Sequence, residues 1–148
     1  MKTATLIGRI LLGLTFVVFG LNGLLHFIPQ PEMPPAAIAF FGGLAAAGYM
    51  LPLLFGTQIV GGVLLLVGIV PLGLLLLAPV IVNIVGFHLF VSPNGLGLAL
   101  VVVVLELFLA WVHRDAFRPL LSSSASVVGA AHERNVGGTT GRLGEVPR

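Results

Sequence analysis

Long apolar runs separated by short breaks dominate this chain. A first run covers about residues 6–27, and an almost unbroken apolar stretch follows from residue 36 to residue 91. A last run, LGLALVVVVLELFLAWV, covers residues 96–112. Because a helix needs about 20 apolar residues to cross the ~30 Å of hydrocarbon in a bilayer, the first and last runs each predict one transmembrane helix.

Prolines divide the middle stretch into three pieces. Pro52 and Pro71 mark the breaks, and the pieces cover residues 36–49, 51–70 and 71–91. The second and third pieces are long enough to span a bilayer, whereas the first is shorter and favours a re-entrant or interfacial helix on the outer side. The pattern therefore predicts an all-α membrane protein, a four-transmembrane-helix bundle with an extra short outer-side helix.

Small residues recur at helical spacing inside the short piece. Ala39, Gly43 and Ala47 lie four residues apart, on one face of the predicted helix. Helices in a bilayer associate through such small residues, which let two backbones approach closely. We therefore expect this segment to pack tightly against the bundle.

The charges orient the predicted bundle. Lys2 and Arg9 flank the start of the first span, and the next Lys or Arg in the chain is Arg114, after the last span. Since cytoplasmic segments are rich in Lys and Arg, both termini are expected in the cytoplasm, which requires an even number of spans. Residues 1–121 then form the membrane domain, and the Gly/Ser-rich residues 122–148 are expected to be a disordered cytoplasmic tail.

Composition narrows the class of protein. Hydrophobic residues make up 57% of the 148 residues and charged residues only 8%, with a mean hydropathy of +1.14, so the lipid bilayer is the first partner. The chain has no Cys, which excludes disulfides and thiolate metal sites. The net charge of +2 comes from a few residues near the ends, without a basic patch, so no nucleic-acid partner is expected.

Glu106 is an ionisable residue inside the last apolar run. A charged side chain at the centre of a membrane helix costs at least ~2.5 kcal/mol on insertion scales, so such residues usually face the protein interior or a wet cavity. Two interpretations are open. Glu106 is either part of a functional site or a protonated carboxyl group that hydrogen-bonds to a neighbouring helix.

Other polar residues of the spans lie in the outer half. Asn22 and His26 are four residues apart and share a helix face, with His26 and His88 close to the outer ends. Imidazoles gain or lose a proton near neutral pH, which suits proton exchange with a carbonyl or quinol oxygen. The alternative is that these groups only hydrogen-bond between helices. The predicted outward-opening pocket has Glu106, His26 and His88 as proton-exchanging catalytic residues and Asn22, Gln58 and Asn83 as ligand-binding residues.

Metal and haem sites are not favoured. No HxxxH, HExxH or carboxylate–His cluster occurs at ligand spacing, so no metal is predicted. Two histidines at similar depth, His26 and His88, raise the question of bis-His haem ligation, but His26 lies almost at the helix end, which makes haem a poor expectation.

Four segments within about residues 9–121 form a further pattern: FGLNGLLHFIPQPEMPP, TQIVGGVLLLVG, APVIVNIVGFHLF and LELFLAWVHRDAFRPLL. These segments resemble the DoxX family of small bacterial membrane proteins. The resemblance implies a four-helix bundle in the bacterial inner membrane. Members of that family and its relatives are linked to thiosulfate:quinone oxidoreductase subunits, to membrane redox complexes and to maturation of periplasmic enzymes. The predicted outer side has no Lys or Arg to hold a dianion, so thiosulfate is not expected as the substrate.

Two functions follow as expectations. The first is a quinone-linked redox-complex subunit in which the outward-opening pocket binds a quinone and a partner subunit supplies electrons. The alternative is a noncatalytic membrane subunit for assembly, anchoring or maturation of a partner protein. Whether the chain is an enzyme is left open. Convergence of the polar residues on one cavity would favour the first function, whereas pairing between helices without a cavity would favour the second.

Overall fold

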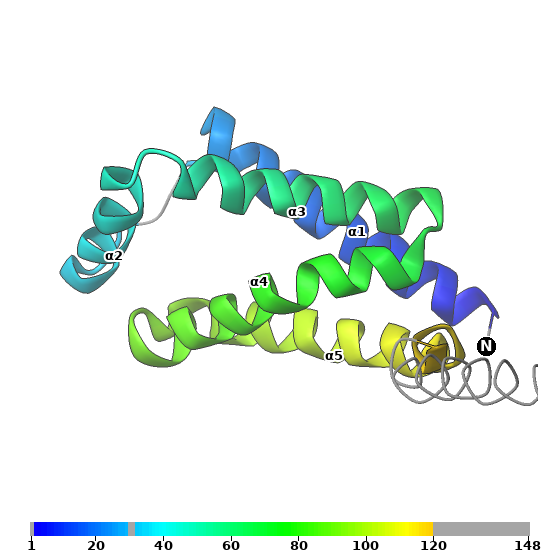
Figure 1. Ribbon diagram of the computed structural model, residues 1–148. Helices are drawn as coiled ribbons and strands as arrows, with labels where there is room; N and C mark the ends of the chain where they lie inside the picture. Colours follow the sequence, from blue (N-terminus) through cyan, green and yellow to red (C-terminus); the bar gives the residue numbers. More distant parts are fainter. Residues whose placement is uncertain (1, 30–31, 120–148) are drawn as a thin grey trace, which may run out of the picture. The chain divides into compact units, whose positions relative to one another are not determined.

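The computed structural model describes residues 2–29 and 32–119. All regular secondary structure in this part of the chain is helical (Figure 1). The fold class predicted from the sequence is confirmed, because four helices are long and apolar enough to cross a membrane and one apolar helix is shorter. The elements are α1 (Lys2–Leu25), α2 (Pro35–Ala46), α3 (Met50–Val67), α4 (Val70–Phe90), the short 3₁₀ helix η1 (Pro93–Gly95) and α5 (Leu96–Val112).

The described residues fall into two compact units, one that ends at His113 and one that begins at Arg114. In the second unit, residues 114–119 are helical, and the Arg118 side chain pairs with Asp115 at 3.3 Å. The predicted tail, residues 122–148, lies outside the described residues.

Proline and glycine set the helix boundaries. Pro52 and Pro71 lie inside the first turns of α3 and α4, so these helices begin at Met50 and Val70, slightly before the predicted breaks. A proline is tolerated there because the first N–H groups of a helix have no intrahelical partner. Gly68 ends α3 in the left-handed conformation, with φ of 96°, and α4 begins two residues later.

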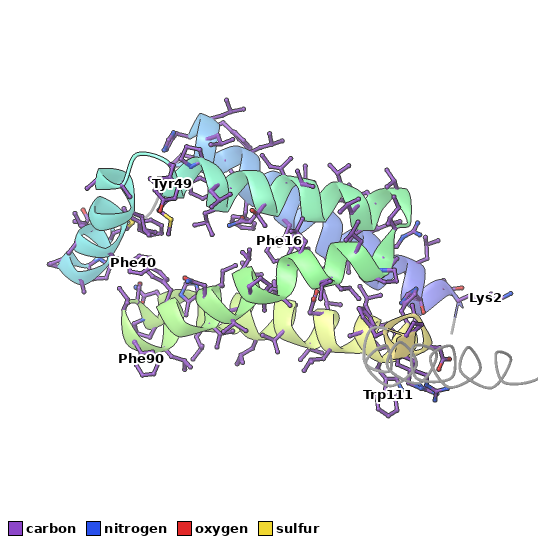
Figure 2. The ribbon with its side chains drawn as sticks, viewed as in Figure 1. Lys2, Phe16, Phe40, Tyr49, Phe90 and Trp111 are labelled. Atoms are coloured by element: carbon purple, nitrogen blue, oxygen red, sulfur yellow. The ribbon has the colours of Figure 1, made fainter. Side chains whose placement is uncertain are left out.

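The first unit has two distinct ends (Figure 1). We call one the basic end, where α1 begins at Lys2, α3 turns into α4 and α5 finishes at Val112. The other is the α2 end, where α1 finishes, α3 begins and α2 lies. Figure 2 shows Trp111 toward the basic end and Tyr49 toward the α2 end, both exposed, as expected for aromatic residues at the two faces of a bilayer.

Glycines bring α1 against α3 and α3 against α4. A Cβ atom on Gly62 would lie 2.7 Å from the carbonyl oxygen of Gly13, and one on Gly73 would lie 3.1 Å from that of Gly61. These contacts join backbone to backbone, which is how helices pack where water does not drive association. The tight packing predicted for the small residues of the short helix is not observed, since a Cβ on Gly43 would meet nothing within 4 Å.

Aromatic rings attach α2 instead. The rings of Phe40 and Phe41 each lie 5.3 Å from the ring of Phe87 near the end of α4, and Ala37 is buried. Such ring pairs stabilise a contact beyond the area that they bury. These ring contacts therefore hold α2 against the last part of α4.

Candidate functional site

Asn22 closes the end of α1. Its side chain is only 3% exposed, and its Oδ1 accepts a hydrogen bond of 2.6 Å from the backbone N–H of Ile28, six residues later. The Asn22 carbonyl oxygen accepts a second bond of 2.8 Å from the N–H of His26. Asn22 thus holds the chain as it leaves the helix, which agrees with the structural interpretation of this amide.

Replacement of Asn22 by Ala is expected to lower the free energy of unfolding by about 1 kcal/mol, because the N–H of Ile28 loses its acceptor. Thermal unfolding of the purified protein in detergent micelles measures the change. The matched control is Asn83→Ala, which removes an exposed amide that makes no hydrogen bond to the described residues and is expected to change stability by less than ~0.5 kcal/mol. Equal effects of the two substitutions would contradict the role given to Asn22.

His26 lies beyond α1, not on it. The helix ends at Leu25, and His26 adopts a φ of 53°, in the left-handed region that few residues other than glycine enter. Its side chain is exposed. The helix face that the sequence predicted for Asn22 and His26 is therefore not present, because the turn stabilised by Asn22 takes His26 out of the helical path.

His88 is part of the turn between α4 and α5. Its Nδ1 donates a hydrogen bond of 2.8 Å to the carbonyl oxygen of Ser92, and its ring lies against Gly95, where a Cβ atom would collide with the imidazole. The ring is half-buried. Since the Nδ1 proton is committed to a backbone oxygen, the first role of His88 is to stabilise this turn.

Gln58 and Asn83 differ in burial although both are amides. Gln58 is 6% exposed in α3, and a Cβ on Gly20 of α1 would lie 3.1 Å from its Cβ. Asn83 is exposed on α4, next to Val82, which is 72% exposed. Neither amide makes a hydrogen bond to the described residues. The two residues therefore present different surfaces, one toward the interior and one toward the surroundings of the bundle.

Glu106 lies toward the basic end. It is 8% exposed, and its buried Oε2 makes no hydrogen bond to the part of the chain that the structure describes. The adjacent Leu105 packs beside α1 at Gly8, whose Cβ would lie 3.7 Å from the Leu105 side chain. Gly20, which marks the level of Gln58, is twelve residues further along α1, or about 18 Å at the rise of an α-helix. Glu106 and Gln58 are therefore too far apart to share a hydrogen bond.

The common pocket predicted for the six site residues stays a prediction. Two surface hollows of the described part of the chain are open to the surroundings. One, of about 370 Å³, lies at the basic end, and the other, of about 340 Å³, lies between α3 and α4 around Gly56, Thr57 and Leu76. None of the six predicted residues lines either hollow. No three His, Asp or Glu side chains of residues 2–29 and 32–119 cluster as metal ligands would, and the expected lack of a metal site stays a prediction.

Arg9 is a polar residue that the sequence gave no reason to place in a site. Its Nε is buried without a hydrogen bond, at the level of α1 where Gly8 meets Leu105 of α5. Arg9 and Glu106 are thus opposite charges on contacting helices at one level, yet no ion pair joins them among the described residues. A sign of this role is present in the sequence, because Arg9 lies seven residues after the first residue of an otherwise apolar helix. The same residue also orients the bundle.

Comparisons with protein-family models, with curated proteins and with solved structures found no match for this chain, so its resemblance to the DoxX family stays a prediction.

Proposed function

We propose that this chain is a noncatalytic membrane subunit that holds a partner protein in the bilayer. The observation that carries the proposal is Asn83, an exposed amide near the middle of a helix that is otherwise apolar on its outer surface. A polar side chain that faces hydrocarbon leaves its hydrogen bonds unmade, whereas a partner helix can supply them. Asn83 is therefore best explained as a contact to another membrane protein.

The surface around Asn83 suits a second helix. Val82 and Leu89 are exposed large apolar residues on the same stretch of α4, and a Cβ on Gly86 would meet nothing within 4 Å. A glycine three residues after Asn83 lets a partner backbone come close to the amide. Bundles in membranes gain on average about 0.6 kcal/mol from one such interhelical hydrogen bond, so van der Waals packing around Gly86 carries much of the proposed contact.

The arrangement of the other polar residues also favours a noncatalytic subunit. A quinone headgroup needs donors near its carbonyl oxygens within one cavity, but Asn22 and His88 are engaged with backbone groups at the ends of their helices. The buried residues Gln58 and Glu106 lie about 18 Å apart along the bundle by the helical rise. This arrangement favours the noncatalytic subunit over a quinone site.

The proposed subunit spans the bacterial inner membrane with its basic end in the cytoplasm. The lengths of the four apolar helices support a multi-pass membrane protein. Lys2 and Arg9 at the basic end support a cytoplasmic position for that end, by the excess of cations in cytoplasmic segments. The resemblance to DoxX proteins supports a bacterial inner membrane. The α2 end then faces outward.

Site-specific photocrosslinking in native membranes tests the proposal. A crosslinker at Val82 is expected to capture one defined membrane protein, and a crosslinker at Val104, which is exposed on α5, is the control for random contacts. Adding Asn83→Leu is expected to weaken the capture from position 82 at least several-fold, because the amide loses its partner. Equal capture from both positions, or capture that Asn83→Leu leaves unchanged, would refute the docking role of α4.

One observation favours the redox subunit as a second candidate. Glu106 keeps a buried carboxylate oxygen without a hydrogen bond, and intramembrane carboxylates often mark sites of proton exchange. The same membrane preparations separate the two functions. A quinone that co-purifies with the protein and is lost in Glu106→Gln would support the redox subunit, while an identified protein partner retained in Glu106→Gln would support the noncatalytic one.

A further inference from the structure

The hollow at the basic end combines positive charge with apolar surface. It measures about 370 Å³ and is open to the outside, and its cationic residues are Lys2 at the start of α1 and Arg9, two turns into the same helix. Thr5 and His113 add polar atoms, and no Asp or Glu is among the described residues that line the hollow. The Nδ1 of His113 donates a hydrogen bond of 2.9 Å to the carbonyl oxygen of Leu109, which fixes the ring at the edge of the hollow. The charge of this hollow fits an anion.

Arg9 is the lining residue with the strongest capacity to bind an anion. A guanidinium carries five N–H donors in a planar fork that matches the oxygens of a phosphate. Within residues 2–29 and 32–119, the Nε of Arg9 is buried and makes no hydrogen bond, and no ion pair with Glu106 compensates its charge. A Cβ on Gly68 would lie 3.1 Å from Arg9 Nη1, so the bare backbone of this turn leaves room for the guanidinium. Since Arg9 lines the hollow, an anion bound there would neutralise the charge of its guanidinium.

The apolar lining residues of the hollow favour an amphipathic anion. Leu6, Val70 and Val112 line the hollow beside the cations, and they lie within two turns of the ends of membrane-length helices. Helix ends of this kind lie at the depth of lipid headgroups, and basic hollows between helices there bind anionic headgroups. A free phosphate ion would use the cations but not the apolar walls.

We infer that this hollow binds the phosphate of an anionic phospholipid, with Arg9 and Lys2 on the phosphate and the apolar residues on the glycerol and upper acyl chains. The site is separate from the α4 surface around Asn83, so it does not depend on the proposed partner. It gives the chain a specific lipid at its basic end, in addition to the nonspecific lipid around its spans.

Native mass spectrometry of the full-length protein, with phosphatidylglycerol or phosphatidylcholine added to the micelles, tests the inference. We expect tighter binding of phosphatidylglycerol, and a loss of about fivefold in its affinity for each of Lys2→Gln and Arg9→Gln, since one basic residue near an anionic surface contributes that much. Arg9→Lys should recover only part of the affinity, because it keeps the charge but loses the fork. Arg118→Gln, which removes an exposed cation outside the hollow, is the matched control and should leave the affinity unchanged.

Three outcomes would overturn the lipid site. One is equal binding of the two lipids, and the second is an Arg9→Gln affinity equal to that of Arg118→Gln. The third is competition by millimolar inorganic phosphate as effective as that of the lipid, which would indicate a small-anion site. Helical content measured by circular dichroism accompanies each variant, and Lys2→Gln changes an exposed residue at the helix start, so it tests the site even if Arg9→Gln does not fold.

Discussion

Gly62→Ala is expected to lower the free energy of unfolding by about 1–3 kcal/mol, the usual cost of forcing an extra group into a packed interior. The added methyl would lie 2.7 Å from the carbonyl oxygen of Gly13 and 3.0 Å from the backbone nitrogen of Val17. These are backbone atoms of α1, which cannot rotate away as a side chain would. The two helices must therefore move apart at Gly62, where α1 and α3 are in close backbone contact.

Gly56→Ala is the matched control on the same helix. A Cβ at Gly56 would meet nothing within 4 Å, so the substitution introduces no clash. Alanine favours helix over glycine by up to about 1 kcal/mol, and the control is expected to be neutral or slightly stabilising. Unfolding of both variants by SDS in mixed micelles gives the comparison. If Gly62→Ala were as stable as Gly56→Ala, α1 and α3 could not be as close as the structure places them.

The glycine contacts show which part of the fold the sequence could predict. Hydrophobic length and the prolines at 52 and 71 were sufficient for four spans, because crossing a bilayer needs a fixed number of apolar residues. Which glycines touch was not predictable. Small residues at helical spacing occur in α2 as well as in α1 and α3, and only the register between two helices decides that Gly62 is in contact and Gly43 is not.

The candidate site was less predictable than the fold for the same reason. Depth along one helix can be estimated from the sequence, but the level of Glu106 relative to Gln58 depends on how α5 and α3 each align with α1. His26 was placed on a helix face because nothing in the sequence marks Leu25 as the last helical residue. Arg9 was used as a topology signal, and its burial follows from packing near the turn at Gly68.

Glu106→Leu is expected to raise the free energy of unfolding by about 1–3 kcal/mol, because a buried polar atom without a hydrogen bond costs about that much. Glu106 is 8% exposed, and its buried Oε2 has no hydrogen-bond partner in the described residues. Leucine has a similar size, so the core position that Glu106 shares with Val102 and Leu109 stays filled. Val104→Leu, at an exposed position of the same helix, controls for added apolar surface and should have little effect.

Glu106→Ala separates the charge from the packing. It removes the same carboxylate but leaves a cavity, and a buried Leu-to-Ala difference is about 2–5 kcal/mol, so Glu106→Ala should be less stable than Glu106→Leu by that amount. Unfolding in mixed micelles measures both variants. A loss of stability in Glu106→Leu would mean that the carboxylate has a partner in the bilayer, and Arg9, at the same level, would be the first residue to test. A gain would mean that the wild-type chain keeps Glu106 at the expense of stability, which is the behaviour of a residue retained for function.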